Sequence, residues 1–89
     1  MLTQSVTLKN QRGLHARASA KFCAAASAWD ADIRVKKDGY SAGGCSIMGL
    51  LTLGAGIGSE IIIEATGPQA KEALDTLVKL VNDRFGEEE

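Results

Sequence analysis

A single histidine, His15, stands directly before a strongly helix-forming run, in the segment Gly13–Arg17 (Gly-Leu-His-Ala-Arg). The start of a helix leaves backbone N–H groups without partners, beside the positive end of the helix dipole. Serine, threonine, aspartate or asparagine would stabilise this position better, because their oxygens accept hydrogen bonds from those groups. A phosphoryl group on the imidazole would supply both oxygens and negative charge. The arrangement therefore predicts a phosphoryl site, with the guanidinium of Arg17 in reach.

Phosphoryl transfer is the chemistry that suits this histidine. An imidazole with the ordinary pKa of ~6.5 offers a neutral nitrogen for in-line attack on phosphorus. Backbone N–H groups and one arginine are enough to position a phosphoryl group and neutralise its charge, and the expected donors are the N–H groups of Ala16, Arg17 and Ala18. On spacing alone, the alternatives are an ordinary surface histidine at position 15 and a solvated helix charge at position 17.

Length and composition narrow the class of protein. The 89 residues predict one domain spanning 1–89, with an exposed acidic tail at 86–89. The net charge of -1 and the absence of a basic block give nucleic-acid binding no electrostatic support. No apolar stretch approaches the ~20 residues of a membrane span, and no signal peptide is recognisable, so we expect a cytoplasmic protein. One histidine and two isolated cysteines, Cys23 and Cys45, form no metal-ligand set and predict reduced thiols.

Hydrophobic periodicity predicts the element order βαββαβα. Alternating patterns indicate strands at residues 4–9 and 32–37, and an Asp-Gly hairpin turn predicts a short returning strand at 40–43. The β-branched run Ile61–Ile63 indicates a further strand at 60–66. Helical patterns cover residues 16 to about 28 and 47–53, and a last apolar stripe runs from Ala70 to Phe85, where Gly86 is expected to end the helix. These elements predict a two-layer α+β sandwich whose antiparallel sheet has one face open to water.

The helix predicted at residues 47–53 carries a second candidate site. Ser46 stands at its cap position, where a side-chain oxygen stabilises a helix. A phosphate would also be accommodated there, so a structural cap and a regulatory phosphorylation site are both open. The segment Ile47–Leu51 holds more large apolar side chains than one face of a two-turn helix can bury. We therefore expect Met48, with Ile47 or Leu51, to stay exposed as a docking surface.

Together the segments Gly13–Arg17, Ser46–Leu51 and Leu53-Gly54 resemble the HPr family, the histidine phosphocarriers of the phosphoenolpyruvate-dependent phosphotransferase system. The resemblance extends over essentially the whole chain, and residues 64–69 resemble the nitrogen-related NPr branch. It implies an open-faced β-sandwich, with a four-stranded antiparallel sheet of order 1-4-2-3 covered on one face by three helices. It implies no cofactor and no metal.

The resemblance also implies a route for the phosphoryl group. Enzyme I would take it from phosphoenolpyruvate and place it on Nδ1 of His15, and an EIIA-type protein would then accept it, in sugar uptake or metabolic regulation. Arg17 would contact the phosphoryl group. In some family members an HPr kinase/phosphorylase modifies the serine that matches Ser46. The protein would act as a monomeric carrier rather than an enzyme. Its partners would dock on an apolar surface that comprises Ala20, Ile47, Met48 and Leu51.

One departure from the family pattern concerns position 18. Most members have proline after the arginine, whereas this chain has Ala18, whose N–H could donate to a phosphoryl oxygen.

A non-covalent regulatory module that binds proteins remains the alternative function, since fold alone does not settle function; such a module would not need His15. A stand-alone enzyme is disfavoured, because the glycines at 54–58 precede a strand and form no nucleotide-binding fingerprint.

Overall fold

The computed structural model describes residues 1–87. These residues form strands and helices in the order βαββαβα, which confirms the predicted order. The elements are β1 (Leu2–Thr7), α1 (Ala16–Ser27), β2 (Asp32–Lys37), β3 (Tyr40–Gly43), α2 (Ile47–Thr52), β4 (Glu60–Thr66) and α3 (Ala70–Asn82), followed by a short 3-10 turn, η1 (Arg84–Gly86).

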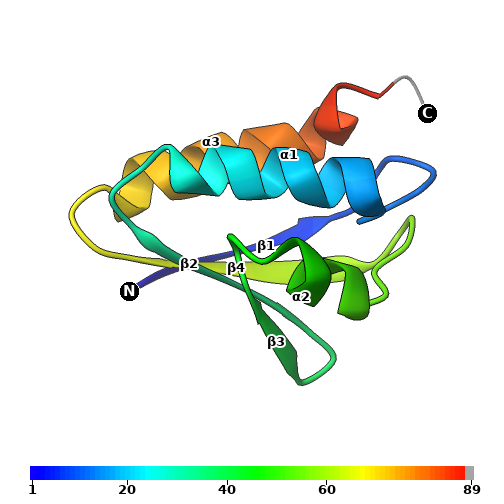
Figure 1. Cartoon of the computed structure of the whole chain (residues 1–89), viewed down its shortest axis with the longest axis horizontal. Helices are drawn as coiled ribbons and strands as arrows, with labels where there is room; N and C mark the ends of the chain where they lie inside the picture. Colours follow the sequence, from blue (N-terminus) through cyan, green and yellow to red (C-terminus); the bar gives the residue numbers. More distant parts are fainter. Residues whose placement is uncertain (88–89) are drawn as a thin grey trace.

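The strands form one antiparallel sheet in the order β1-β4-β2-β3, as the family resemblance implied. β4 is an interior strand, paired with β1 on one side and β2 on the other. Helices α1 and α3 lie side by side over one face of the sheet, and α2 packs against α1 and β3 (Figure 1). The fold is therefore the predicted open-faced, two-layer α+β sandwich.

The core lies between the helices and the covered face of the sheet. Alternate side chains of β4, such as Ile61 and Ile63, are fully buried there, whereas Ile62 between them points to the open face and is 38% exposed. Phe22 of α1 and Leu77 of α3 are buried against this face. Side chains alternate between the two faces of a strand, so every second residue of β4 faces the helices and the residues between face the open side.

The first strand differs from its prediction at both ends. It begins at Leu2 and ends at Thr7, two residues earlier than the predicted range of 4–9. Pairing with β4 stops at Thr7 because its partner, Glu60, is the first residue of that strand. Leu8 is nevertheless buried, and its backbone bonds to the loop before β4 through Gly58 and Ser59.

The end of the chain also departs from the predicted pattern. α3 ends at Asn82 instead of continuing to Gly86, because Arg84 and Phe85 both adopt a left-handed φ of 54°. This turn redirects the backbone and still buries the side chain of Phe85. The prediction of an exposed acidic tail is wrong at Glu87, which is partly buried; the last two glutamates, at 88–89, lie outside the described residues.

Candidate functional site

His15 is the N-cap of α1, as the sequence predicted. Its backbone is extended, its Nδ1 accepts a hydrogen bond from the N–H of Arg17 at 3.2 Å, and its carbonyl accepts from the N–H of Ser19 at 2.8 Å. A ring nitrogen therefore performs the capping role that a serine or aspartate oxygen usually performs. The lone pair of Nδ1 lies at the positive end of the helix.

The second ring nitrogen of His15 has a different partner. Nε2 lies 2.5 Å from Oε2 of Glu87, and the side chains of the two residues are 19% and 15% exposed. Because Nδ1 accepts a hydrogen bond, the neutral ring must carry its proton on Nε2 and donate it to Glu87. These two hydrogen bonds fit the neutral tautomer in which Nε2 carries the proton and Nδ1 keeps its lone pair.

Glu87 is held from its other side by a fully buried asparagine. Nδ2 of Asn10 donates to Oε1 of Glu87 at 3.0 Å and to the carbonyl of Gly13 at 2.8 Å. Burial disfavours ionisation of Glu87, but the hydrogen bonds from His15 and Asn10 outweigh it and lower the pKa of the carboxyl. The carboxylate is thus ionised and accepts hydrogen bonds with both oxygens.

The predicted phosphate-binding groups gather at the same helix terminus. The N–H groups of Ala16 and Ala18 have no hydrogen-bond partner among residues 1–87, and that of Arg17 is bonded to Nδ1 of His15. Arg17 is exposed, and its guanidinium forms no ion pair within this part of the chain. Ala16 and Arg17 are exposed, whereas Ala18 is fully buried, so its N–H is unpaired but closed off by the surrounding side chains.

A loop distant in sequence supports this terminus. The N–H of Leu14 donates to the carbonyl of Ala55 at 2.9 Å, and a Cβ on Gly13 would lie 2.3 Å from the same oxygen. Gly13 also has a left-handed φ of 62°. Sequence reasoning identified residues 54–58 only as a turn and missed Asn10, Ala55 and Glu87. Of these, only the glycine-rich composition around Ala55 gave a local signal of close backbone contact.

Ser46 and the predicted docking residues lie on α2 and the adjoining part of α1. Ser46 is confirmed as the N-cap of α2, since its Oγ accepts from the N–H of Gly49 at 3.0 Å, and the residue is exposed. Ile47 is 40% exposed and Met48 is 70% exposed, whereas Leu51 is half-buried. Ala20 is exposed on α1, against which α2 packs. We call Ala20, Ile47, Met48 and Leu51 the apolar surface.

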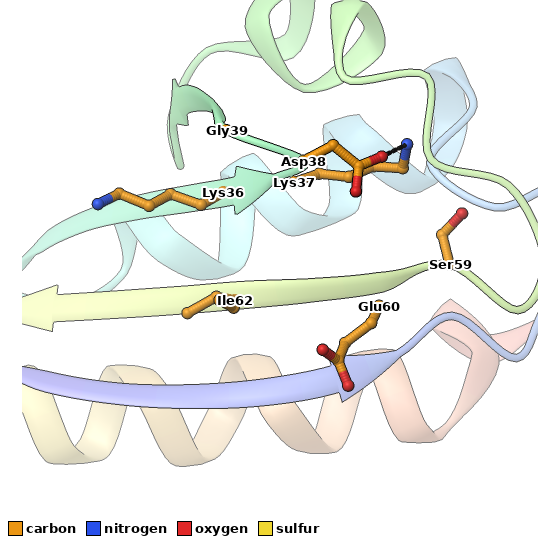
Figure 2. Close-up of a pocket in the computed structure, with 7 residues that line it drawn as sticks. All are labelled: Lys36, Lys37, Asp38, Gly39, Ser59, Glu60 and Ile62. Carbon is orange, nitrogen blue, oxygen red and sulfur yellow. Dashed lines mark hydrogen bonds and ion pairs between the residues drawn. The ribbon is translucent and has the colours of Figure 1, made fainter.

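A pocket of about 370 Å³ lies elsewhere, on the open face of the sheet, and does not include His15 (Figure 2). Two of the residues that line it, Lys37 and Asp38, form an ion pair. Among residues 1–87, no group of histidine, cysteine and acidic side chains is arranged to hold a metal ion, and no helix could span a membrane. The pocket is lined by Lys36, Lys37, Asp38, Gly39, Ser59, Glu60 and Ile62.

Comparison with known proteins agrees with this arrangement. A family model described as "PTS HPr component phosphorylation site" matches residues 2–83. The chain is 43% identical to phosphocarrier protein HPr of Cupriavidus necator over 89 residues, covering 100% of both chains. It is 40% identical to phosphocarrier protein NPr of Shewanella violacea over 86 residues, covering 97% of this chain and 94% of that protein.

Solved structures show the same likeness over the full length of the chain. The crystal structure of HPr from Thermoanaerobacter tengcongensis superposes with a TM-score of 0.96 at 38% identity, covering 100% of both chains. The family match, the relatives and the shared fold agree with the histidine at the helix start. The chain therefore belongs to the HPr family of phosphocarrier proteins of the phosphotransferase system.

Proposed function

We propose that the chain carries a phosphoryl group on Nδ1 of His15, accepts it from phospho-Enzyme I and passes it to an EIIA-type protein. The observation that carries this proposal is the position of Nδ1: unprotonated, at a helix N-terminus, with backbone donors beside it. Family membership supplies the class of function, a phosphocarrier of the phosphotransferase system.

The hydrogen bond at Nδ1 explains how the site receives the phosphoryl group. When the lone pair of Nδ1 attacks phosphorus, the N–H of Arg17 loses its acceptor and becomes free to donate to a phosphoryl oxygen. The exposed N–H group of Ala16 adds a further donor, whereas the N–H of Ala18, which a proline would lack, lies in a fully buried residue and would need a shift of the backbone to donate. Contacts of this kind contribute roughly 0.3–1 kcal/mol each. Such moderate stabilisation suits a group that must be released again.

The apolar surface is the proposed docking site for both partners. It combines the exposed Ile47 and Met48 with Ala20 of α1, the helix whose first turn carries the site. Methionine suits a surface that binds more than one partner, because its side chain adapts to different shapes. We expect the protein to act as a monomer and a single domain, leaving this surface free.

Ser46 is proposed as a regulatory site for an HPr kinase/phosphorylase. Its exposure supports this, and so does its position next to Ile47 of the apolar surface, where added negative charge would oppose docking. Its hydrogen bond with Gly49 equally supports a purely structural role as a helix cap. Incubation with such a kinase and ATP, compared with Ser46→Ala, decides between the two roles.

The central test is phosphorylation in solution. The protein is incubated with Enzyme I and phosphoenolpyruvate, and its intact mass is measured before and after acid treatment. We expect an acid-labile gain of one phosphoryl group, absent in His15→Ala. No gain with an Enzyme I that phosphorylates another HPr would reject the proposal. Binding of Enzyme I without phosphoryl uptake would instead favour the non-covalent protein-binding module.

A further inference from the structure

The carboxylate of Glu87 reaches His15 from 72 positions along the chain. Three contacts hold the C-terminal segment in this place. The side chain of Phe85 is buried, Nζ of Lys21 donates to its carbonyl at 2.7 Å, and the N–H of Glu87 donates to the carbonyl of Arg84 at 2.9 Å. In Figure 1 the turn η1, drawn in red, lies beside α1 at the end of the molecule where α1 begins. Glu87 is therefore placed by the fold and is not a charge on a loose tail.

The hydrogen bonds around Glu87 have a fixed polarity. Asn10 must present its NH₂ group to Glu87, because the same nitrogen donates to the carbonyl of Gly13. Turning the amide over would bring its oxygen against two acceptors, an arrangement that buried polar groups avoid. Glu87 therefore accepts from Asn10 with one oxygen and is left to accept from His15 with the other.

We propose that Glu87 is a positioning residue for phosphoryl transfer: it holds the ring proton of His15 on Nε2 and so keeps the lone pair on Nδ1. This inference rests on the proposed phosphocarrier function and adds a residue to it. Two hydrogen bonds act on the ring in concert, one donated by the Arg17 N–H to Nδ1 and one accepted by Glu87 from Nε2.

The proposed step balances without a proton leaving the ring. The lone pair of Nδ1 forms the N–P bond, while the bond between phosphorus and its donor breaks and its electron pair leaves with the donor. The ring becomes an imidazolium whose positive charge faces the carboxylate of Glu87. On transfer to the acceptor, the electron pair of the N–P bond returns to Nδ1. The proton stays on Nε2 throughout.

The variant Glu87→Gln tests this assignment with almost no change of shape. A glutamine offers one acceptor and one NH₂ group, so it cannot accept from both Asn10 and His15 as the carboxylate does. Nitrogen-15 NMR of the ring, at a pH where imidazole is neutral, reports the protonation of each nitrogen. We expect a hydrogen-bonded Nε2–H in the wild type, weakened or lost to solvent exchange in Glu87→Gln and Glu87→Ala.

Asp83→Asn is the matched control, since it removes one exposed carboxylate from the same end of the chain and leaves the contacts of Glu87 intact. Circular dichroism checks that every variant is folded. An Nε2–H resonance that is identical in the wild type and both Glu87 variants would overturn the inference.

Kinetics supply the second measurement. The initial rate of phosphorylation by Enzyme I should fall about tenfold in Glu87→Gln, the scale of one hydrogen bond to a charged group, and stay unchanged in Asp83→Asn. A faster rate in Glu87→Gln would mean that Glu87 shields the ring, and would overturn the inference. If the wild type itself takes up no phosphoryl group, the proposed function fails, while the NMR comparison still decides whether Glu87 holds the ring proton.

Discussion

At the scale of single residues, the two nitrogens of His15 are given different tasks by different parts of the chain. The Arg17 N–H donates to Nδ1, and Glu87 accepts a hydrogen bond from the proton on Nε2. The guanidinium of Arg17 stands apart from this network, exposed and without an ion pair among residues 1–87. It is therefore free to turn toward a phosphoryl group when one arrives.

Replacing Arg17 by alanine should slow phosphoryl transfer roughly tenfold to a hundredfold. A hydrogen bond to a charged group contributes about 1.5–3 kcal/mol, and about 1.4 kcal/mol corresponds to a factor of ten in rate. Rapid-quench measurements with Enzyme I and an EIIA-type acceptor give the rate. Arg34→Ala, on the open face of the sheet, is the control; an equal loss in both variants would show a general effect of charge.

At the scale of elements, the start of α1 is held by the loop before β4. Gly13 combines a left-handed φ of 62° with close contact to the carbonyl of Ala55, so no other residue fits without movement of one backbone or the other. The site is thus built where two loops meet, and its geometry depends on a segment that takes no part in the chemistry.

Gly13→Ala should destabilise the protein more than Gly39→Ala. Both glycines have a positive φ, which costs an alanine about 1–2 kcal/mol, but only at Gly13 does the new Cβ meet a backbone atom, since nothing lies within 4 Å of it at Gly39. Urea unfolding measures both free energies. Equal losses would show that the contact with Ala55 relaxes without cost.

The apolar surface makes a separate prediction for α2. Met48→Glu should weaken transfer from Enzyme I by at least tenfold, because a buried, unpaired carboxylate costs several kcal/mol at an interface. The thermal midpoint should hardly change, since Met48 is 70% exposed. Tyr40→Glu is the control: it is 73% exposed and lies on the edge strand β3. Unchanged transfer by Met48→Glu would remove this surface from the docking site.

At the scale of the whole molecule, the hydrogen bonds of Glu87 join three distant segments. Asn10 precedes the site, His15 begins α1, and Glu87 follows the last helix. Phe85 anchors the end of the chain in the core, so the carboxylate belongs to the folded domain. Global stability and the state of the histidine are therefore coupled through one side chain.

This coupling predicts a dependence of stability on pH. The pKa of Glu87 is lowered below its ordinary value of 4.5, so its ionised form stabilises the folded state above that value, and the stabilisation is lost as pH falls through the folded pKa. His15 and Lys21 are the basic groups that face it. The difference in unfolding free energy between the wild type and Glu87→Gln should thus be present above pH 4.5 and decrease as the pH falls through the lowered pKa of Glu87. A difference that is constant with pH would contradict this.

The sequence determined most of the helix and strand positions, and it determined that His15 lies at the N-terminus of a helix. The bounds of β2, β3 and β4 follow from two-residue alternation and a β-branched run, and the starts of α1 and α2 follow from His15 and Ser46. The start of a helix depends on hydrogen bonds between residues close together in the chain, and a strand's alternation depends on which side chains face solvent. Both can therefore be predicted from a short stretch of sequence. The position of His15 at a helix N-terminus is of this kind.

Only the tertiary structure decided how the ring of His15 is held. Glu87 belongs to a segment whose acidic composition predicts exposure, and it reaches the ring because Phe85 packs in the core and the backbone turns at a left-handed φ. Asn10 and Ala55 likewise gain their roles through contacts between distant segments. Such contacts depend on how complete layers pack, and no local pattern specifies them. The sequence thus determined the histidine and its helix, whereas the packing of the chain end decided its tautomer.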